Sequence, residues 1–179
     1  MIEEVNDIVL SSNDTIAYVA GGNGGLFIVD VSNPNEPRII SKTDVNGFYD
    51  SIDGITLSSD EKIAYLSDFT DGMYIVDISD IKKPKVLSHA VFIVGGDKKG
   101  IHGDGNTISL SSDGNKAYAV VGYGGLFAID VSDPKKPTII GSAVLPGKTE
   151  GIAISDDDTK AYIQTRNNGL TIVDLTVFE

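Results

Sequence analysis

The sequence predicts an all-β fold built from four copies of one small sheet, and three observations support this prediction. The first is a motif, GGLFIVDVSNPNEP at residues 24–37, which returns in related form at residues 72–84, 124–137 and 169–176. The second is its spacing, because the aspartates of the four copies lie 47, 53 and 44 residues apart, at Asp30, Asp77, Asp130 and Asp174. The third is a tyrosine 12 residues before each aspartate, at Tyr18, Tyr65, Tyr118 and Tyr162. Short apolar runs at a period of about 40–50 residues are typical of the blades of a β-propeller.

Each repeat is expected to form a four-stranded antiparallel blade. In the second repeat, residues 54–57 and 63–67 are strand-like runs on either side of the polar stretch 58–62, which predicts a hairpin. A third strand is expected at residues 73–79 and a fourth at 86–92. The third strands are apolar at nearly every position, as expected of strands that neighbouring blades cover on both faces. We therefore expect one domain over residues 1–179, with blades at about 7–47, 54–93, 106–146 and 151–179.

The aspartate and tyrosine of each repeat are interpreted as structural. An aspartate at the end of a strand readily accepts hydrogen bonds from backbone N–H groups of the turn that follows. The alternative is a ring of metal-binding or catalytic carboxylates. We favour the structural role because equivalent positions of a radial array lie far apart.

Composition excludes several classes of partner. The chain has 179 residues, a formal net charge of −12 and a pI of about 4.4, so it would repel nucleic acid. It contains no cysteine, which removes disulfides and thiolate metal sites. No apolar run approaches the length of about 20 residues that a membrane-spanning helix needs, so we expect no membrane insertion. The first residues, MIEEVND, are acidic and predict no signal peptide in this chain.

The repeats resemble a known family. GGLFIVDVSNPNEP, GMYIVDISDIKKP and GGLFAIDVSDPKKP, preceded by IAYVA, IAYLS and KAYAV, resemble the LVIVD repeats of bacterial and archaeal cell-surface β-propeller proteins. The polar turns SSNDT, SSDEK, SSDGN and SDDDT also resemble those of surface-layer propellers with YVTN-type repeats. The resemblance spans about residues 7–176 and implies an extracellular or cell-surface interaction scaffold without catalytic activity. It supplies no catalytic motif.

The two ends of the chain do not complete a blade together. The fourth strand of the third repeat starts near Thr138, and the corresponding position of the last repeat would be 182, beyond Glu179. One outer strand is therefore expected to be missing or short. Three arrangements follow: part of a larger propeller, which we favour, a four-bladed ring with one three-stranded blade, or half of an eight-bladed ring formed by two chains. Unpaired edges and uncovered apolar faces also predict self-association through the incomplete terminal blades.

One face of the propeller is the expected binding surface. Loops that join second to third strands, and fourth strands to the next blade, share this face, and an insertion at residues 94–106 extends one of them. Its aromatic side chains could form a platform for a sugar or a peptide. The candidate residues are Phe48, Tyr49, Asp50, Asp53, Phe69, Asp97, His102, Asp104, Tyr123, Glu150 and Arg166.

Catalytic and metal-binding interpretations are weaker. His102 and Asp104 could form a metal or acid–base pair, but a metal site needs three or four ligands, so solvated loop charges are favoured. Residues 156–158 match a hairpin turn better than a calcium loop, whereas Asp50, Asp53 and Glu150 could bind a cation in the axial channel. The other histidine, His89, is expected at the surface of an outer strand.

We therefore expect a non-catalytic, adhesion-like module that binds a protein or glycan and needs no cofactor. The alternative is a calcium-dependent propeller hydrolase or lactonase.

Overall fold

The computed structural model describes residues 2, 4–45, 51–68, 72–92 and 107–178. Within these residues the chain forms four antiparallel sheets, of which three have four strands and the last has three. The helical content is limited to two short 3-10 turns, η1 (Gly122–Gly124) and η2 (Thr176–Phe178). The predicted all-β fold is confirmed.

The sheets follow one another along the chain. The first contains β1 (Asp7–Leu10), β2 (Ile16–Ala20), β3 (Leu26–Asp30) and β4 (Arg38–Thr43). The second contains β5 (Ile52–Leu57), β6 (Ile63–Asp68), β7 (Gly72–Asp77) and β8 (Lys85–Val91). The third contains β9 (Thr107–Leu110), β10 (Lys116–Val121), β11 (Gly125–Asp130) and β12 (Thr138–Ala143). The fourth contains β13 (Thr149–Ile154), β14 (Lys160–Thr165) and β15 (Gly169–Asp174).

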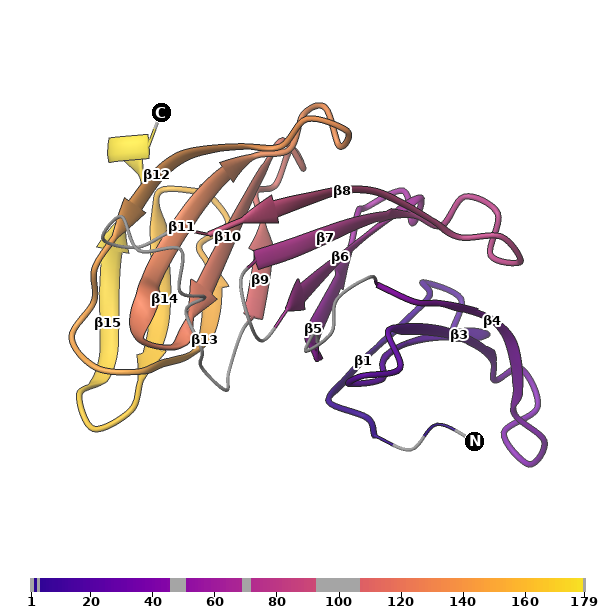
Figure 1. Ribbon diagram of the computed structural model, residues 1–179. Coiled ribbons are helices and arrows are strands. Elements are labelled where there is room, and N and C mark those ends of the chain that lie inside the picture. Colours follow the sequence, from indigo (N-terminus) through magenta and orange to yellow (C-terminus); the bar gives the residue numbers. More distant parts are fainter. Residues whose placement is uncertain (1, 3, 46–50, 69–71, 93–106, 179) are drawn as a thin grey trace.

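Each sheet is a meander in which every strand pairs with its neighbour in sequence. The four sheets stand side by side like blades, with the N-terminus at one end of an open arc and the last sheet at the other (Figure 1). The first strands β1, β5, β9 and β13 contact one another in turn along this arc. The arrangement is therefore not a closed four-bladed ring, and the fourth sheet lacks an outer strand, as the repeat spacing predicts.

The hydrophobic core consists of layers between successive sheets. Tyr18 lies in a cluster with residues of the second sheet, Tyr65 in one with the third sheet, and Tyr118 in one with the fourth. Hydrogen bonds from serine hydroxyl groups also join outer strands to the following sheet. Ser41 Oγ donates to the carbonyl of Ile81 and Ser88 Oγ to that of Pro134, both at 2.6 Å. The repeated tyrosine thus marks the face that each sheet turns toward the next.

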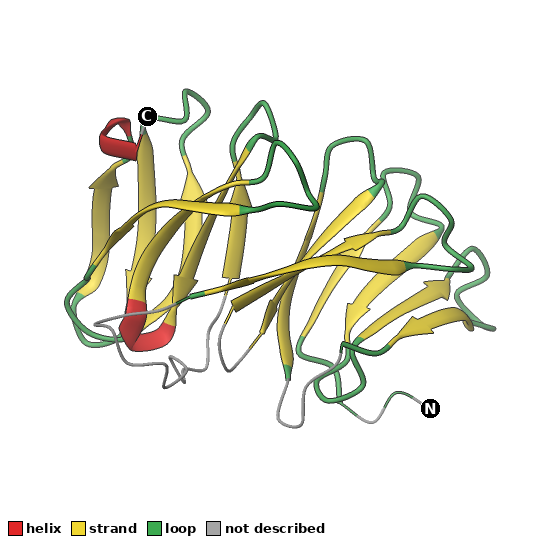
Figure 2. Cartoon of the chain, turned by 45° about the horizontal axis from the view of Figure 1, so that its top comes forward, coloured by secondary structure: helices red, strands yellow, loops and turns green. Residues whose placement is uncertain are grey.

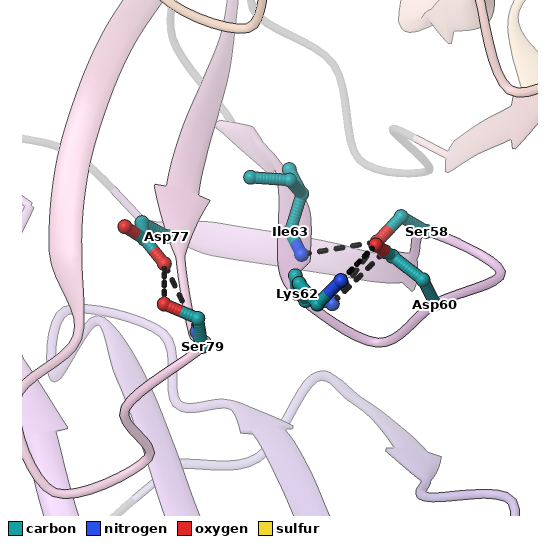
Figure 3. A network of polar contacts seen from close by, with 6 residues as sticks. All are labelled: Ser58, Asp60, Lys62, Ile63, Asp77 and Ser79. Carbon is teal, nitrogen blue, oxygen red and sulfur yellow. Dashed lines mark hydrogen bonds and ion pairs between the residues drawn. The ribbon is translucent and has the colours of Figure 1, made fainter.

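The motif aspartates fix the turns that leave the third strands. Asp77 Oδ1 accepts from the N–H of Ser79 at 3.0 Å and from its hydroxyl at 2.6 Å (Figure 3). The same pair of bonds joins Asp30 to Ser32, Asp130 to Ser132 and Asp174 to Thr176. These are the hydrogen bonds expected from the sequence, and the hydroxyl and N–H donors lower the pKa of each of the four aspartates.

The hairpin turns between first and second strands are held by a second aspartate. Asp60 Oδ1 accepts from the hydroxyl of Ser58 at 2.8 Å and from the N–H of Lys62 at 3.2 Å, and Ser58 Oγ accepts from the N–H of Ile63 at 3.0 Å (Figure 3). Asp113 and Asp157 make the equivalent bonds in the third and fourth sheets. The run 156–158 is therefore part of a hairpin turn, as predicted.

His89 departs from the expected surface position. It lies on β8 and stacks on Tyr74 of β7, with ring centroids 4.0 Å apart and an interplanar angle of 3°. The two residues are cross-strand partners in the sheet, so the rings meet face to face and His89 is half-buried. No helix in the described residues is long and apolar enough to cross a bilayer.

Candidate binding face

The predicted binding loops leave one edge of the arc, which is called the loop face here. Among the described residues it includes Gly21–Gly25, η1, residues 144–148 and residues 166–168. In Figure 2, η1 lies at the lower edge of the molecule, whereas η2 and the C-terminus lie at the upper edge. The hairpin turns such as residues 58–62 belong to the opposite edge because each strand reverses the chain direction.

The structure describes part of the predicted site. Asp53, Tyr123, Glu150 and Arg166 are described, with Asp53 in the second sheet and the other three in the third and fourth repeats. The remaining candidates lie outside the described residues: Phe48, Tyr49, Asp50, Phe69, Asp97, His102 and Asp104.

In the third repeat, Tyr123 is the middle residue of η1 and is 70% exposed. The first residue of this turn, Gly122, and the residue after it, Gly125, have positive φ values of 37° and 84°, which favour glycine. The carbonyl of Gly122 accepts a buried hydrogen bond of 2.9 Å from Thr149 Oγ1 of the fourth sheet. The aromatic ring therefore projects from a turn that the neighbouring blade holds in place.

Glu150 belongs to β13, which contacts this turn, and it forms an ion pair with Arg166. Arg166 Nε lies 2.6 Å from Glu150 Oε1, and Gln164 Nε2 donates to Glu150 Oε2 at 3.0 Å. Glu150 sits at a register shift between Thr149 and Gly151, and such bulges re-aim side chains at functional edges of sheets. The side chain of Arg166 is 57% exposed, so its guanidinium is accessible to a partner.

Asp53 lies at the junction of the first two sheets. It also lies at a register shift, between Ile52 and Gly54 of β5, and is therefore the counterpart of Glu150 in the second sheet. Asn6 Nδ2 donates to Asp53 Oδ1 at 3.3 Å and to the carbonyl of Ile52 at 3.0 Å. This carboxylate anchors the N-terminal segment, and the structure does not bring it together with Glu150.

Two buried charged residues at this edge were not singled out from the sequence. Asp68, the last residue of β6, is almost fully buried, and so is Lys148, directly before β13. Alignment of the repeats could have singled out Asp68, because uncharged residues, Val121 and Thr165, occupy the corresponding strand ends of the third and fourth sheets. A charged residue among apolar and small counterparts marks a position where the repeats differ.

The described residues contain no group of three or more histidine, aspartate or glutamate side chains that could hold a metal ion. A shallow pocket of about 460 Å³ lies away from the loop face and is lined by Asn115, Lys116, Asp130, Ser132, Ile140, Val177 and Phe178. None of the predicted binding residues lines this pocket, and Asp130 is bonded to Ser132 there.

Comparisons with known proteins agree with the repeat architecture. The LVIVD repeat model matches four segments, at residues 4–45, 56–88, 104–144 and 146–176. No curated protein matches the chain.

Several solved structures share the fold at low identity. A putative 6-phosphogluconolactonase from Bacteroides uniformis superposes with a TM-score of 0.78 at 14% identity, covering 95% of this chain and 50% of that one. The periplasmic gluconolactonase PpgL of Pseudomonas aeruginosa gives 0.74 at 12% identity, covering 98% and 55%. The β-propeller domain of Cps50 (Swd1) from Myceliophteria thermophila gives 0.73 at 12% identity, covering 94% and 50%. The chain thus spans about half the length of these structures, and the likeness shows a propeller fold.

Proposed function

The chain belongs to the LVIVD repeat family, and on that premise we propose that it is a non-catalytic β-propeller module that binds a protein or glycan partner at a cell surface. The binding surface is the part of the loop face formed by Tyr123, Glu150 and Arg166. The observation that carries the proposal is the exposed ring of Tyr123 on a turn fixed by the buried bond between Thr149 and Gly122.

The chemistry of this patch suits recognition better than stabilisation. An exposed tyrosine offers a large apolar area and a hydroxyl at a low cost in conformational entropy, which is why tyrosine is frequent at binding surfaces. An ion pair that is half open to solvent contributes only about 0–1 kcal/mol to folding. The Glu150–Arg166 pair therefore gains its main value by presenting charged hydrogen-bonding groups next to the ring.

The test is a binding screen with matched variants. Wild-type protein is applied to a glycan array and to an extract of cell-surface proteins, with bound proteins identified by mass spectrometry. Tyr123→Ala and Arg166→Ala are expected to lose at least tenfold in affinity for whichever glycan or protein the wild type retains, as is typical when an interface anchor is removed. Val177→Ala is the control, because Val177 is also 70% exposed but lies in η2 at the opposite edge. Equal binding by Tyr123→Ala and wild type would remove this surface from consideration.

A second candidate is a metal-dependent hydrolase or lactonase, which the names of two similar structures suggest. It would use channel-facing acidic residues together with the predicted His102. The discriminating assay measures gluconolactone hydrolysis and the melting temperature with calcium and with chelator. The interaction module predicts no hydrolysis above the spontaneous rate and no calcium-dependent shift. Hydrolysis that His102→Ala abolishes would favour the enzyme instead.

A further inference from the structure

The two ends of the arc expose sheet faces that the repeats elsewhere bury. The face of a sheet that points toward the next sheet in sequence is called its trailing face, and the opposite side its leading face. The trailing-face tyrosines Tyr18, Tyr65 and Tyr118 are only 1–3% exposed, because the following sheet covers them. Tyr162 occupies the same position in the fourth sheet and is 37% exposed.

The trailing face of the fourth sheet carries an exposed apolar group on β14 and β15, next to the polar side chains of Lys160 and Gln164. Tyr162 lies opposite Ile172 in the register of β14 and β15, and Ile172 is exposed. Leu170 is 64% exposed, whereas its counterparts Leu26, Met73 and Leu126 are completely buried. This apolar group therefore has the composition of an internal blade contact without the sheet that would cover it.

The leading face of the first sheet is open along β1, whereas Ala17, Val19, Phe27 and Val29 of β2 and β3 are buried in a cluster of their own. Ile8 and Leu10 of β1 are exposed, and they lie opposite Val19 and Ala17 of β2. Their counterparts pack against the preceding sheet, as Ile108 and Leu110 do in the third repeat and Ile152 and Ile154 in the fourth. Ile2 packs against Val19 and its neighbours in β2 and β3, so the N-terminal segment covers part of this face.

A polar contact between hairpin turns gives an independent indication. The fourth residue of each turn has a left-handed φ, and in two sheets its carboxylate reaches back to the preceding turn. Glu61 Oε1 accepts from the N–H of Ser12 at 2.6 Å, and Asp158 Oδ1 accepts from the N–H of Ser112 at 3.0 Å.

Asp14 holds the same position in the first turn, with φ of 58°, and makes no such contact within the described residues. A non-glycine residue in this conformation costs free energy, which the carboxylate contact offsets in the turns of the second and fourth sheets. The second residue of the last turn, Asp156, would be the counterpart of Ser12 and Ser112.

We propose that the trailing face of the fourth sheet binds the leading face of the first sheet of a second copy of this chain, and that two such contacts close a ring of eight blades. In this chain, what covers a trailing face is always the leading face of another repeat of the same family. The two end faces are unlike, so the contact is heterologous, and a heterologous contact forms a closed ring when its rotation allows. The chain spans 50% and 55% of two propeller structures that it resembles, so two copies supply about one ring.

The new junction is weaker than the internal ones for two reasons. Asp156 places a carboxylate where Ser12 and Ser112 place a hydroxyl, and this charge opposes Asp14 of the second copy. Ile2 competes with the incoming sheet for the leading face. Asp156→Ser and Ile2→Ser are therefore expected to strengthen the association, each by about tenfold in Kd, which corresponds to 1.4 kcal/mol.

The experiment measures molar mass by light scattering and sedimentation over a range of protein concentrations. The wild type is expected to reach twice the chain mass of 18.9 kDa. Leu170→Arg on the trailing face and Ile8→Arg on the leading face are each expected to give monomers. Val86→Arg, an exposed apolar position on β8 away from both ends, is the control and is expected to remain dimeric. Circular dichroism melts confirm that the variants are folded.

Mixing Leu170→Arg with Ile8→Arg tests whether the contact is heterologous. The mixture retains one intact trailing face and one intact leading face, on different chains, so it is expected to regain a dimer that neither variant forms alone. A wild type that stays at the chain mass up to about 1 mM would overturn the proposal, since weaker contacts do not assemble a ring. Masses that keep growing with concentration would overturn the closed ring in favour of open polymers.

Discussion

Ile129 and Ile139 offer a matched test of how the sheets are stabilised. They lie opposite each other in β11 and β12, but Ile129 is completely buried between the second and third sheets, whereas Ile139 is 43% exposed on the outer strand. Truncation to alanine removes the same atoms at both sites. The difference between the two variants therefore reports on burial between blades.

The expected cost follows from the buried atoms. Removing three carbon atoms at Ile129 loses about 2.4 kcal/mol at ~0.8 kcal/mol for each buried methylene, and the cavity left behind raises the total to about 3–4 kcal/mol. At Ile139 little cavity forms, and the partly buried side chain contributes about 1 kcal/mol. Ile129→Val, which removes a single methyl group, should cost about 1 kcal/mol as well.

Urea and thermal unfolding measure these changes. For a domain of this size each 1 kcal/mol shifts the melting temperature by about 2–4 °C, so Ile129→Ala should lower it by about 10 °C and Ile139→Ala by about 3 °C. Circular dichroism and tyrosine fluorescence should report the same transition if the blades unfold together. Equal losses at the two positions would refute the claim that contacts between sheets dominate stability.

Three further predictions follow from the turns and from the loop face. Hydrogen bonds lower the pKa values of Asp60, Asp113 and Asp157 to about 2, and the strongest donors are the side chains of Lys62, Ser111 and Ser155, respectively. The stabilising contribution of these carboxylates is therefore present above about pH 4 and is lost as the pH falls toward 2. Replacing these three aspartates with asparagine should reduce the fall in melting temperature between pH 4 and pH 2. The fold should persist because Asn13 already makes these bonds in the first turn. An unchanged dependence of the melting temperature on pH would count against the turns as its source. Gly125→Ala should unfold or strongly destabilise the protein, since φ is 84° and the new Cβ would collide with the carbonyl oxygen of Ala143. Gly114→Ala, at φ of 71° in open space, should lower the free energy of unfolding in urea by only about 1 kcal/mol. Similar losses for the two variants would exclude the collision as the cause. Thr149→Val should remove the buried hydrogen bond to the carbonyl of Gly122 and lower the free energy of unfolding by about 1–3 kcal/mol, measured as a lower urea midpoint. Thr176→Val removes an exposed bond to Asp174 and should lower it by less. The reverse order would contradict the role of Thr149 in holding η1.

The repeat architecture could be predicted because its signals are local. The motif places Asp77 at the end of β7, and the spacing of 12 residues to Tyr65 corresponds to one hairpin, with Tyr65 opposite Ile75. The aspartate has the same role in the turn of every repeat, and the tyrosine contacts the next sheet in the first three repeats. Repetition at four places makes such local signals stronger than any single strand would be.

The candidate site could be predicted only in part because it depends on register. Glu150 lies on β13 and Arg166 directly follows β14, and their contact occurs at the register shift after Thr149. No pattern of residues in the sequence predicts this shift. The same kind of shift directs Asp53 toward Asn6 instead of toward another loop. The surface position predicted for His89 is wrong for a related reason, since the cross-strand ring of Tyr74 covers one side of it.

Within each repeat, the contacts that stabilise the fold and the loops proposed to bind a partner involve different residues, so stability and recognition can vary separately. The turn aspartates and the layers between sheets recur in every blade, so each blade is stabilised by the same contacts whatever its loops contain. On the loop face, by contrast, the described positions differ from blade to blade, as Asp68, Val121 and Thr165 do at equivalent strand ends. A repeated scaffold with unequal loops is the arrangement expected of a protein whose fold is set by its blades and whose partner is chosen by its loops.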